Sequence, residues 1–320
     1  MKVLIVCTGN FGFIKPFVSE QVDAIVENGI EVDYFLIKGK GVYGYLKNII
    51  NFRKKVKKGN YDIIHAHYGL SGFFALFQRK TPVITTFHGV DLIDPENAFC
   101  KSGRIKKGYV FLSKIAARYS NYNIFVNSNI KVFPNKKHSI ISCGVDLNSF
   151  FPMDKSDCRK ILNLSLEKKL VLFGTSFDYG IRKNYDLAAK AIALIEDVEL
   201  IEIKNINRDK VNLLMNACDV LLMTSFFETG PQVVKEGMAC NCPIVTTDVG
   251  DVREVMGDTE GCYITTYEPE DVAEKIKMAL EFGKKTKGRE RMGVSENSVI
   301  ADKIIDVYKQ VMEKLNNKEC

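Results

Sequence analysis

The chain contains the segment Asp219-Val-Leu-Leu-Met223-Thr-Ser-Phe-Phe-Glu228-Thr-Gly-Pro231-Gln-Val-Val-Lys-Glu236-Gly-Met-Ala. Its apolar start, Asp219 to Met223, predicts a buried strand. A Gly-Pro loop follows, and Pro231 suits the first position of a helix, where its missing N–H costs nothing. We therefore expect a strand, a loop and a helix whose free N–H groups can bind an anion.

Two glutamates of this segment, Glu228 and Glu236, have seven residues between them. Their carboxylates cannot bind the anion, but they can accept strong hydrogen bonds from neighbouring hydroxyl groups. A ligand that carries phosphate flanked by polyol groups, such as a sugar nucleotide, suits both features. The alternative is two unrelated, solvated glutamates. The strand, the Gly-Pro helix start and the continuation to Val245 argue against it.

The segment resembles the donor-site motif of retaining glycosyltransferases of family 4. This resemblance implies the α/β fold called GT-B, in which two Rossmann-like, doubly wound domains face a central cleft. It implies that Glu228 lies near the donor sugar and that Glu236 holds the ribose hydroxyls. Thr229 departs from the glycine of many members, which changes the shape expected for the sugar pocket. The donor-binding backbone by this resemblance is that of Gly230, Pro231, Gln232 and Val233.

A second loop, from Gly174 to Asn184, follows the predicted strand Leu170 to Phe173 and contains the adjacent cations Arg182 and Lys183. Paired cations can neutralise a departing diphosphate. The family resemblance implies this catalytic role for Arg182 and Lys183, with Gly174 at the donor. A solvated basic pair before a helix is the alternative.

In the first half of the chain, Gly9-Asn-Phe-Gly12 lies between a predicted strand and a helix. Glycines here let the backbone approach a ligand closely. The spacing is not Gly-x-Gly-x-x-Gly, which argues against a dinucleotide site. By the resemblance, the loop with Gly9 and Gly12 reaches the donor phosphates or the acceptor. A simple tight turn is the alternative.

His88 follows the predicted strand Val83 to Thr86, within the run Thr85-Thr-Phe-His88-Gly-Val-Asp91. The run resembles the family pattern around a histidine near the donor sugar, which implies a catalytic role for His88. A structural histidine that caps the strand is the alternative. We expect nearby His67 to line the cleft and His65 to be structural, because no third metal ligand is evident.

Composition favours a soluble globular protein, with 46% apolar and 26% charged residues and a net charge of +6. No apolar run is long enough to cross a bilayer, and no signal peptide is recognisable. The nine cysteines form no Cys-x-x-Cys pair, which argues against a zinc ribbon or redox motif. We therefore expect a cytoplasmic protein. The absence of an Asp-x-Asp triplet predicts a metal-independent enzyme without cofactors.

Short apolar runs alternate with helical patterns in two series, which predicts two parallel sheets with helical crossovers. We expect an acceptor-side domain over residues 1–151 and a nucleotide-sugar donor domain over residues 152–297. A terminal helix over residues 298–316 resembles the family helix that packs back on the first domain. The expected strands are 3–7, 31–37, 62–65, 83–86, 124–126, 140–142, 170–173, 198–203, 219–223, 244–246 and 262–265, and the expected helices include 16–28, 43–58, 186–195, 208–216 and 271–282.

The expected helix from Tyr43 to Lys58 is amphipathic and basic, with Tyr45, Leu46, Ile49, Phe52 and Val56 on its apolar face. An ordinary helix that covers the sheet and solvates its lysines is the plain interpretation. Family 4 enzymes often use a basic first domain to contact anionic membranes and lipid-linked acceptors. Peripheral membrane contact at the inner face is therefore a second hypothesis.

Taken together, the motifs predict a retaining transferase that moves a sugar, most simply from a UDP-sugar, to a glycan or lipid-linked acceptor in polysaccharide biosynthesis. A non-catalytic subunit that binds nucleotide sugars is one alternative, and an NAD-dependent doubly wound enzyme is another. No nucleic-acid motif accompanies the basic charge, so we expect no nucleic-acid partner.

Overall fold

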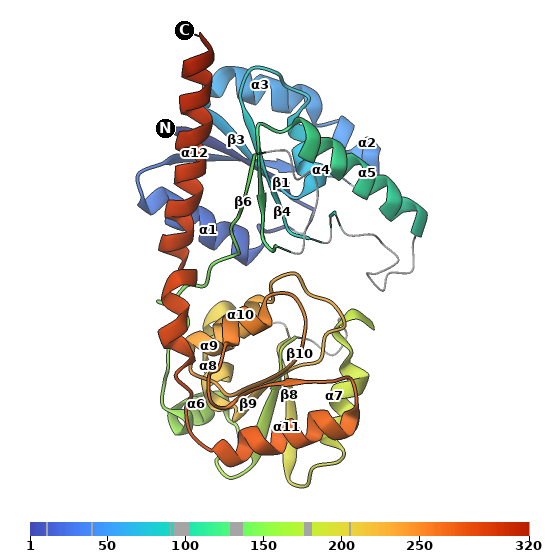
Figure 1. Ribbon diagram of the computed structural model, residues 1–320, viewed down its shortest axis with the longest axis vertical. Helices are drawn as coiled ribbons and strands as arrows, with labels where there is room; N and C mark the ends of the chain where they lie inside the picture. Colours follow the sequence, from blue (N-terminus) through green and yellow to red (C-terminus); the bar gives the residue numbers. More distant parts are fainter. Residues whose placement is uncertain are drawn as a thin grey trace. The chain divides into compact units, whose positions relative to one another are not determined.

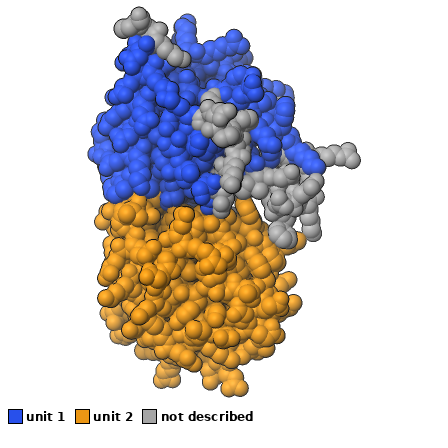
Figure 2. Space-filling model, in the orientation of Figure 1, with its two compact units in different colours: residues 1–143, 297–320 blue, residues 144–296 orange. Residues whose placement is uncertain are grey.

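The computed structural model describes residues 1–10, 12–39, 41–89, 91–92, 103–128, 137–175, 181–204 and 206–319. The chain divides into two compact units (Figure 2). Unit 1 comprises Met1–Cys143 with Asn297–Cys320, and unit 2 comprises Gly144–Glu296. The first division lies upstream of the expected one between 151 and 152, because Val145 and Phe150 already pack into the core of unit 2.

Unit 1 is built on a six-stranded parallel sheet in the order β2-β1-β3-β4-β5-β6 (Figure 1). Its strands are β1 (Lys2–Thr8), β2 (Glu31–Ile37), β3 (Ile63–His67), β4 (Val83–Phe87), β5 (Tyr122–Phe125) and β6 (His138–Ile140). Its helices are α1 (Pro16–Glu27), α2 (Gly41–Leu46), α3 (Ile49–Gly59), α4 (Gly69–Ala75), α5 (Gly103–Tyr119) and α12 (Asn297–Glu319).

Alternation along the central strand β1 sends its apolar side chains to both faces of this sheet. Val3 and Ile5 join one buried cluster with residues of α1 and α12. Leu4 and Val6 join another with residues of α3 and α4. The C-terminal helix α12 thus completes the core of unit 1, and Tyr308 is its largest fully buried side chain.

Unit 2 is built on a five-stranded parallel sheet in the order β11-β10-β9-β7-β8. Leu170 and Leu172 pack with α8, α9 and α10 on one face, whereas Val171 and Phe173 pack with α7 and α11 on the other. The strands are β7 (Lys169–Phe173), β8 (Val198–Glu202), β9 (Val220–Met223), β10 (Ile244–Thr247) and β11 (Cys262–Thr265). The helical segments are α6 (Lys155–Leu162), η2 (Ile181–Lys183), α7 (Tyr185–Ile192), α8 (Arg208–Ala217), α9 (Gln232–Ala239), α10 (Val252–Met256), α11 (Pro269–Phe282) and η3 (Gly288–Ser295).

Each sheet has one point at which the order of its strands reverses, between β1 and β3 in unit 1 and between β7 and β9 in unit 2. Loops at the carboxyl ends of the two strands diverge there, and open α/β sheets bind ligands in the resulting crevice. In unit 2 these loops begin at Gly174 and Thr224, and in unit 1 they begin at Gly9 and Tyr68. Both therefore contain residues that the sequence singles out.

Most expected elements are present, but the expected helix over residues 43–58 is wrong as a single element. It is divided into α2 and α3, because the side chain of Asn48 donates to the backbone carbonyls of Lys38 and Gly44 at the break. Phe52 and Val56 are buried as expected, whereas Leu46, at the end of α2, is exposed. Pro231 precedes the first helical residue rather than occupying it. The edge strand β6 covers His138–Ile140 instead of the expected residues 140–142. Its pairing with Asn123 to Phe125 of β5 sets this register.

Candidate functional site

The loop after β9 places Glu228 between the two predicted cations. Lys183 Nζ lies 2.7 Å from Glu228 Oε1, and Arg182 Nη1 lies 2.7 Å from Oε2. The Ser225 hydroxyl donates to Oε1 at 3.0 Å. The structure thus brings together three of the predicted catalytic residues on one edge of the unit 2 sheet.

Burial and charge oppose each other at this ion triad. Burial alone raises the pKa of the Glu228 carboxyl, but the adjacent Lys183 and Arg182 cations bring it below its usual value. Burial lowers the pKa of the Lys183 ammonium, and Glu228 works against that shift. The side chains of Lys183 and Glu228 are only 13% and 12% exposed, so an anion that enters here meets cations in a low-dielectric setting.

Backbone contacts fix the basic pair to the end of β9. Phe226 N donates to Arg182 O at 2.9 Å, and Arg182 Nη1 donates to Phe227 O at 2.9 Å. The Thr224 hydroxyl lies 2.9 Å from the carbonyl oxygen of Asn184. The two loops at the switch point of the strand order are therefore one connected structure, which presets the position of the cations before a ligand binds.

Glycines allow the close packing of the surrounding loops. A Cβ on Gly174 would lie 3.3 Å from both methyl groups of Val233, and a Cβ on Gly230 would lie 3.3 Å from Asp251 Oδ2. Gly250 has a φ of +65°, and a Cβ there would lie 2.9 Å from the Thr229 carbonyl. The loop from Asp248 thus packs closely against the Glu228 loop and supports it.

The loop from Asp248 also contains one partner of a buried ion pair that was not predicted from the sequence. Lys235 Nζ lies 3.2 Å from Asp251 Oδ2, and the Lys235 side chain is 1% exposed. Breaking one partner of such a pair is costly, because the other charge remains buried. The start of α9 is held on its other side by Gln232, whose Nε2 donates to Gly144 O at 2.6 Å. The backbone from Gly230 to Val233 is therefore fixed from both sides.

Glu236 lies in α9 with 5% of its side chain exposed, and Arg208 Nη1 lies 2.6 Å from its Oε1. Arg208 is the first residue of α8, and its guanidinium stacks 4.6 Å over the Phe150 ring. Sequence reasoning missed Arg208. A signal did exist, since α8 follows β8 and so must begin at the same sheet edge as the Glu228 loop.

In unit 1, Gly9 and Gly12 shape the loop after β1. A Cβ on Gly9 would lie 2.9 Å from Leu36 Cβ, and Gly12 has a φ of +78°. The Asn10 side chain accepts from Gly39 N at 2.7 Å and donates to Gly39 O at 3.0 Å. Gly9 and Gly12 therefore lie in a tight turn. Contact of these glycines with a ligand stays a prediction. Phe11 of this motif lies outside the described residues.

Three histidines stack at the carboxyl ends of β3 and β4. The ring centroids of His65 and His67 are 4.6 Å apart, and those of His67 and His88 are 5.5 Å apart. Burial lowers the pKa of His67 to about 4 and also lowers those of His65 and His88. His88 is 9% exposed and its Nε2 lies 3.2 Å from His67 Nδ1. Near neutral pH, His88 is thus an uncharged hydrogen-bonding group.

His65 contacts side chains of two other elements, α12 and β4, as expected for a structural residue. Its Nδ1 lies 2.6 Å from the Tyr308 hydroxyl of α12, and its Nε2 lies 2.7 Å from the Thr86 hydroxyl. Three residues after His88 in the sequence, Asp91 Oδ2 accepts from Gly69 N at 2.7 Å, and burial raises the pKa of Asp91 to about 6. Val90, between His88 and Asp91, lies outside the described residues.

The described residues form neither a metal-ligating cluster nor a membrane-spanning helix. Within the described ranges, no group of three or more His, Cys, Asp or Glu side chains is arranged to hold a metal ion. Across that same part of the chain, no helix is both long and apolar enough to span a bilayer.

Comparison with known proteins places these features in context. The family model described as Glycosyltransferase Family 4 matches residues 3–149, and the model described as Glycosyl transferases group 1 matches residues 158–295. The N,N'-diacetylbacillosaminyl-diphospho-undecaprenol alpha-1,3-N-acetylgalactosaminyltransferase of Campylobacter jejuni is 26% identical over 314 residues, which cover 84% of this chain and 82% of that protein.

Solved structures share the fold. Sucrose-phosphate synthase from Thermosynechococcus elongatus aligns with a TM-score of 0.86 and 17% identity over 98% of this chain and 100% of that one. Anabaena HepE, solved in complex with UDP and glucose, aligns with a TM-score of 0.66 and 18% identity over 99% of each chain.

Proposed function

The chain is a glycosyltransferase of family 4 with the GT-B fold, and we propose that it moves a sugar from a UDP-sugar to a lipid-linked glycan. We further propose that the anomeric configuration is retained and that no metal ion takes part. The single observation that carries the proposal is the Arg182–Glu228–Lys183 triad at the switch point of unit 2.

Breaking the bond between the anomeric carbon and the diphosphate leaves negative charge on the phosphate oxygens. Arg182 and Lys183 supply two fixed positive charges for it, which is the role a divalent metal plays in other transferases. Glu228 holds both cations in place and has its own carboxylate beside the sugar. We assign no protein nucleophile.

Glu236 is proposed to bind the ribose hydroxyls. One oxygen of its buried carboxylate is bound to Arg208, which fixes its rotamer. A fixed, charged acceptor forms stronger hydrogen bonds to a diol than a mobile, solvated one. HepE was solved with UDP, and this supports uridine as the first base to test.

In unit 1, neutral His88 is proposed to orient a sugar or acceptor hydroxyl. Its pKa is lowered by burial, so it can accept or donate a hydrogen bond without carrying charge. The name of the Campylobacter jejuni relative specifies a diphospho-undecaprenol-linked sugar, which supports a lipid-linked acceptor for this chain.

A lipid-linked acceptor requires that the enzyme reach a membrane surface. Helices α2 and α3 of unit 1 present a region that could contact such a surface. Tyr43 and Ile50 are 81% and 67% exposed, and Lys54, Lys57 and Lys58 lie in the same helical region. We propose that this region contacts anionic lipid at the inner face of the membrane. Co-sedimentation with phosphatidylglycerol vesicles tests this. Loss of binding on replacing the three lysines with glutamine is expected, and no binding at low salt ends the idea.

Thermal stabilisation by UDP, GDP, ADP and NAD tests the donor site. A ligand at about one hundred times its dissociation constant adds roughly 2.7 kcal/mol to stability. Stabilisation by UDP that is lost in Glu236→Ala and kept in the exposed control Glu254→Ala is expected. Stabilisation by NAD alone contradicts the proposal. Stabilisation by GDP or ADP in place of UDP contradicts a UDP-sugar donor and indicates a GDP-sugar or an ADP-sugar.

A further inference from the structure

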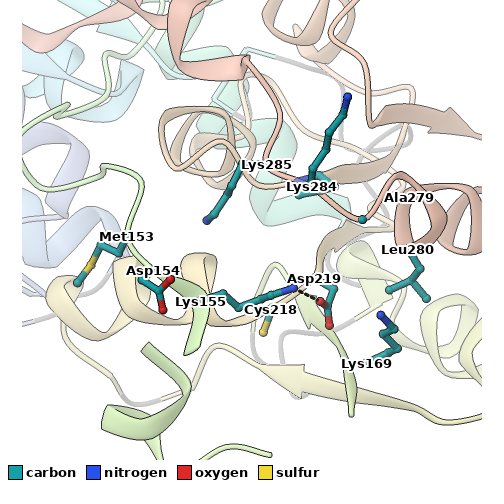
Figure 3. Close-up of a pocket in the computed structure, with 12 residues that line it drawn as sticks. Met153, Asp154, Lys155, Lys169, Cys218, Asp219, Ala279, Leu280, Lys284 and Lys285 are labelled. Atoms are coloured by element: carbon teal, nitrogen blue, oxygen red, sulfur yellow. Dashed lines mark hydrogen bonds and ion pairs between the residues drawn. The ribbon is translucent and has the colours of Figure 1, made fainter. Parts of the chain in front are cut away.

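Unit 2 contains a pocket of about 300 Å³ (Figure 3). The strand ends that line it place it at the opposite edge of the sheet from the donor site. Lys169 is the first residue of β7, Asp219 immediately precedes β9, and Pro243 immediately precedes β10. The amino ends of three strands therefore line the pocket, whereas the Glu228 triad lies past the carboxyl ends. The two sites are separated by the strand length, about 15 Å.

Four lysines line this pocket: Lys155, Lys169, Lys284 and Lys285. They come from three separate parts of unit 2, namely the start of α6, the start of β7 and the residues after α11. Gathering like charges in one hollow is unfavourable unless counter-charges are present. The pocket is also lined by two carboxylates, those of Asp154 and Asp219. Its net charge toward a ligand therefore depends on whether these carboxylates already have partners in the protein.

The Asp219 carboxylate is paired with cations, whereas Asp154 is held by hydrogen bonds alone and keeps its negative charge. Asp219 Oδ1 lies 2.8 Å from Lys155 Nζ (Figure 3), and its Oδ2 lies 2.8 Å from Arg159 Nη2. Asp154 caps α6, accepting from Asp157 N and from the Ser156 hydroxyl. Among the ion pairs of the described residues, Lys169, Lys284 and Lys285 have no carboxylate partner.

Lys285 is the most constrained of these three lysines. Its Nζ donates to two neutral acceptors, Asn216 Oδ1 at 2.7 Å and Cys240 O at 3.3 Å. Burial lowers its pKa, and the nearby Lys155 lowers it further, although several thiols oppose this. An anion in the pocket relieves both effects, because it supplies the missing opposite charge.

We propose that this pocket binds a phosphate group, as part of a compact organic phosphate or of a lipid headgroup. Three ammonium groups supply the charge, and Met153, Pro243, Ala279 and Leu280 supply apolar surface for the attached carbon skeleton. The volume is enough for one small molecule. The pocket is separate from the proposed donor site, and only the design of its test, which occupies that site with UDP, rests on the proposed function.

Calorimetric titration with inorganic pyrophosphate tests the proposal on the full chain saturated with UDP, which blocks the Arg182 and Lys183 cations. The test variant is Lys169→Gln with Lys284→Gln, because both side chains are exposed and neither forms a hydrogen bond or an ion pair within the described residues. Lys284 Nζ makes one aromatic contact, 4.9 Å from the centroid of the Phe282 ring. The matched control is Lys190→Gln with Lys277→Gln, two exposed lysines on α7 and α11 that make the same change in net charge.

We expect wild type and the control to bind pyrophosphate alike and the test variant to bind it about tenfold more weakly. If pyrophosphate does not bind, but phosphatidylglycerol vesicles bind more weakly to the test variant than to the control, the phosphate belongs to a lipid. If the test variant and the control bind both probes equally, the proposal that this pocket binds phosphate is wrong. The affinity for UDP, measured in the same variants, reports separately on the donor site and should not change.

Discussion

The ammonium group of Lys183 lies 2.7 Å from Oε1 of Glu228, although the two residues belong to loops that follow different strands, β7 and β9. The pair joins the two loops at the point where the strand order reverses. A buried cation held in this way needs no reorganisation when charge develops on a leaving diphosphate.

Replacing Lys183 with alanine should lower kcat by a factor of about 10² to 10³, because one fixed charge that faces the leaving group is lost. KM for the donor should change much less, since Arg182 and the backbone of α9 remain. Steady-state kinetics with the preferred UDP-sugar measures both values. Lys190→Ala, an exposed lysine on α7, is the control and should match wild type.

Replacing Glu236 with alanine should raise the Kd for UDP by about ten- to a hundredfold, as expected for loss of charged hydrogen bonds to a diol. The Kd for uridine should rise with it, whereas the Kd for pyrophosphate at the same site should change little. Fluorescence or calorimetric titration gives these values. Unchanged uridine affinity would show that the ribose is bound elsewhere.

Asp91 predicts a specific dependence of stability on pH. Its carboxyl titrates near 3.8 in the unfolded chain, but its pKa in the fold is about 6, because it is buried. Between these values the folded state holds the proton that the unfolded state has lost. The free energy of unfolding therefore falls as pH rises.

Asp91→Asn removes this titration and keeps an acceptor for Gly69 N. From pH 4 to pH 7, wild type should lose roughly 2 kcal/mol of stability relative to the variant. Urea denaturation across this range measures the difference. A difference that does not vary with pH would show that Asp91 titrates normally in the fold.

Tyr308 links α12 to the sheet of unit 1 through its 2.6 Å contact with His65. Tyr308→Phe should lower the free energy of unfolding by about 1 to 3 kcal/mol, because it leaves a buried ring nitrogen without its partner. Tyr43→Phe removes an exposed hydroxyl and should have almost no effect. Urea denaturation compares the two variants, and equal stabilities would contradict a structural role for the Tyr308 contact.

Much of unit 2 could be predicted because its signals are local. An apolar run, a Gly-Pro loop and a helical pattern follow each other around Glu228, and Arg182 with Lys183 follows a second strand. The family resemblance implies that those residues share one donor site, and parallel strands that end at one sheet edge allow them to meet. The structure confirms that they do, and it adds that Glu228 binds both cations directly.

The contacts that sequence reasoning missed depend on geometry that no short pattern contains. Arg208 reaches Glu236 across 28 residues of sequence, and Tyr308 reaches His65 across 243. The division between α2 and α3 depends on side-chain bonds of Asn48, in a stretch whose hydrophobic period alone predicts one helix. Each of these needs the tertiary fold to be known first.

The most direct test of the central claim is release of UDP from a panel of UDP-sugars in the presence of EDTA and an undecaprenyl-diphosphate-linked sugar. Wild type should release UDP from at least one donor at a rate that EDTA does not change, and the product should keep the anomeric configuration of the donor. Lys183→Ala should release it at least about a hundredfold more slowly. Full activity in Lys183→Ala, or activity that requires a divalent metal, would contradict the account.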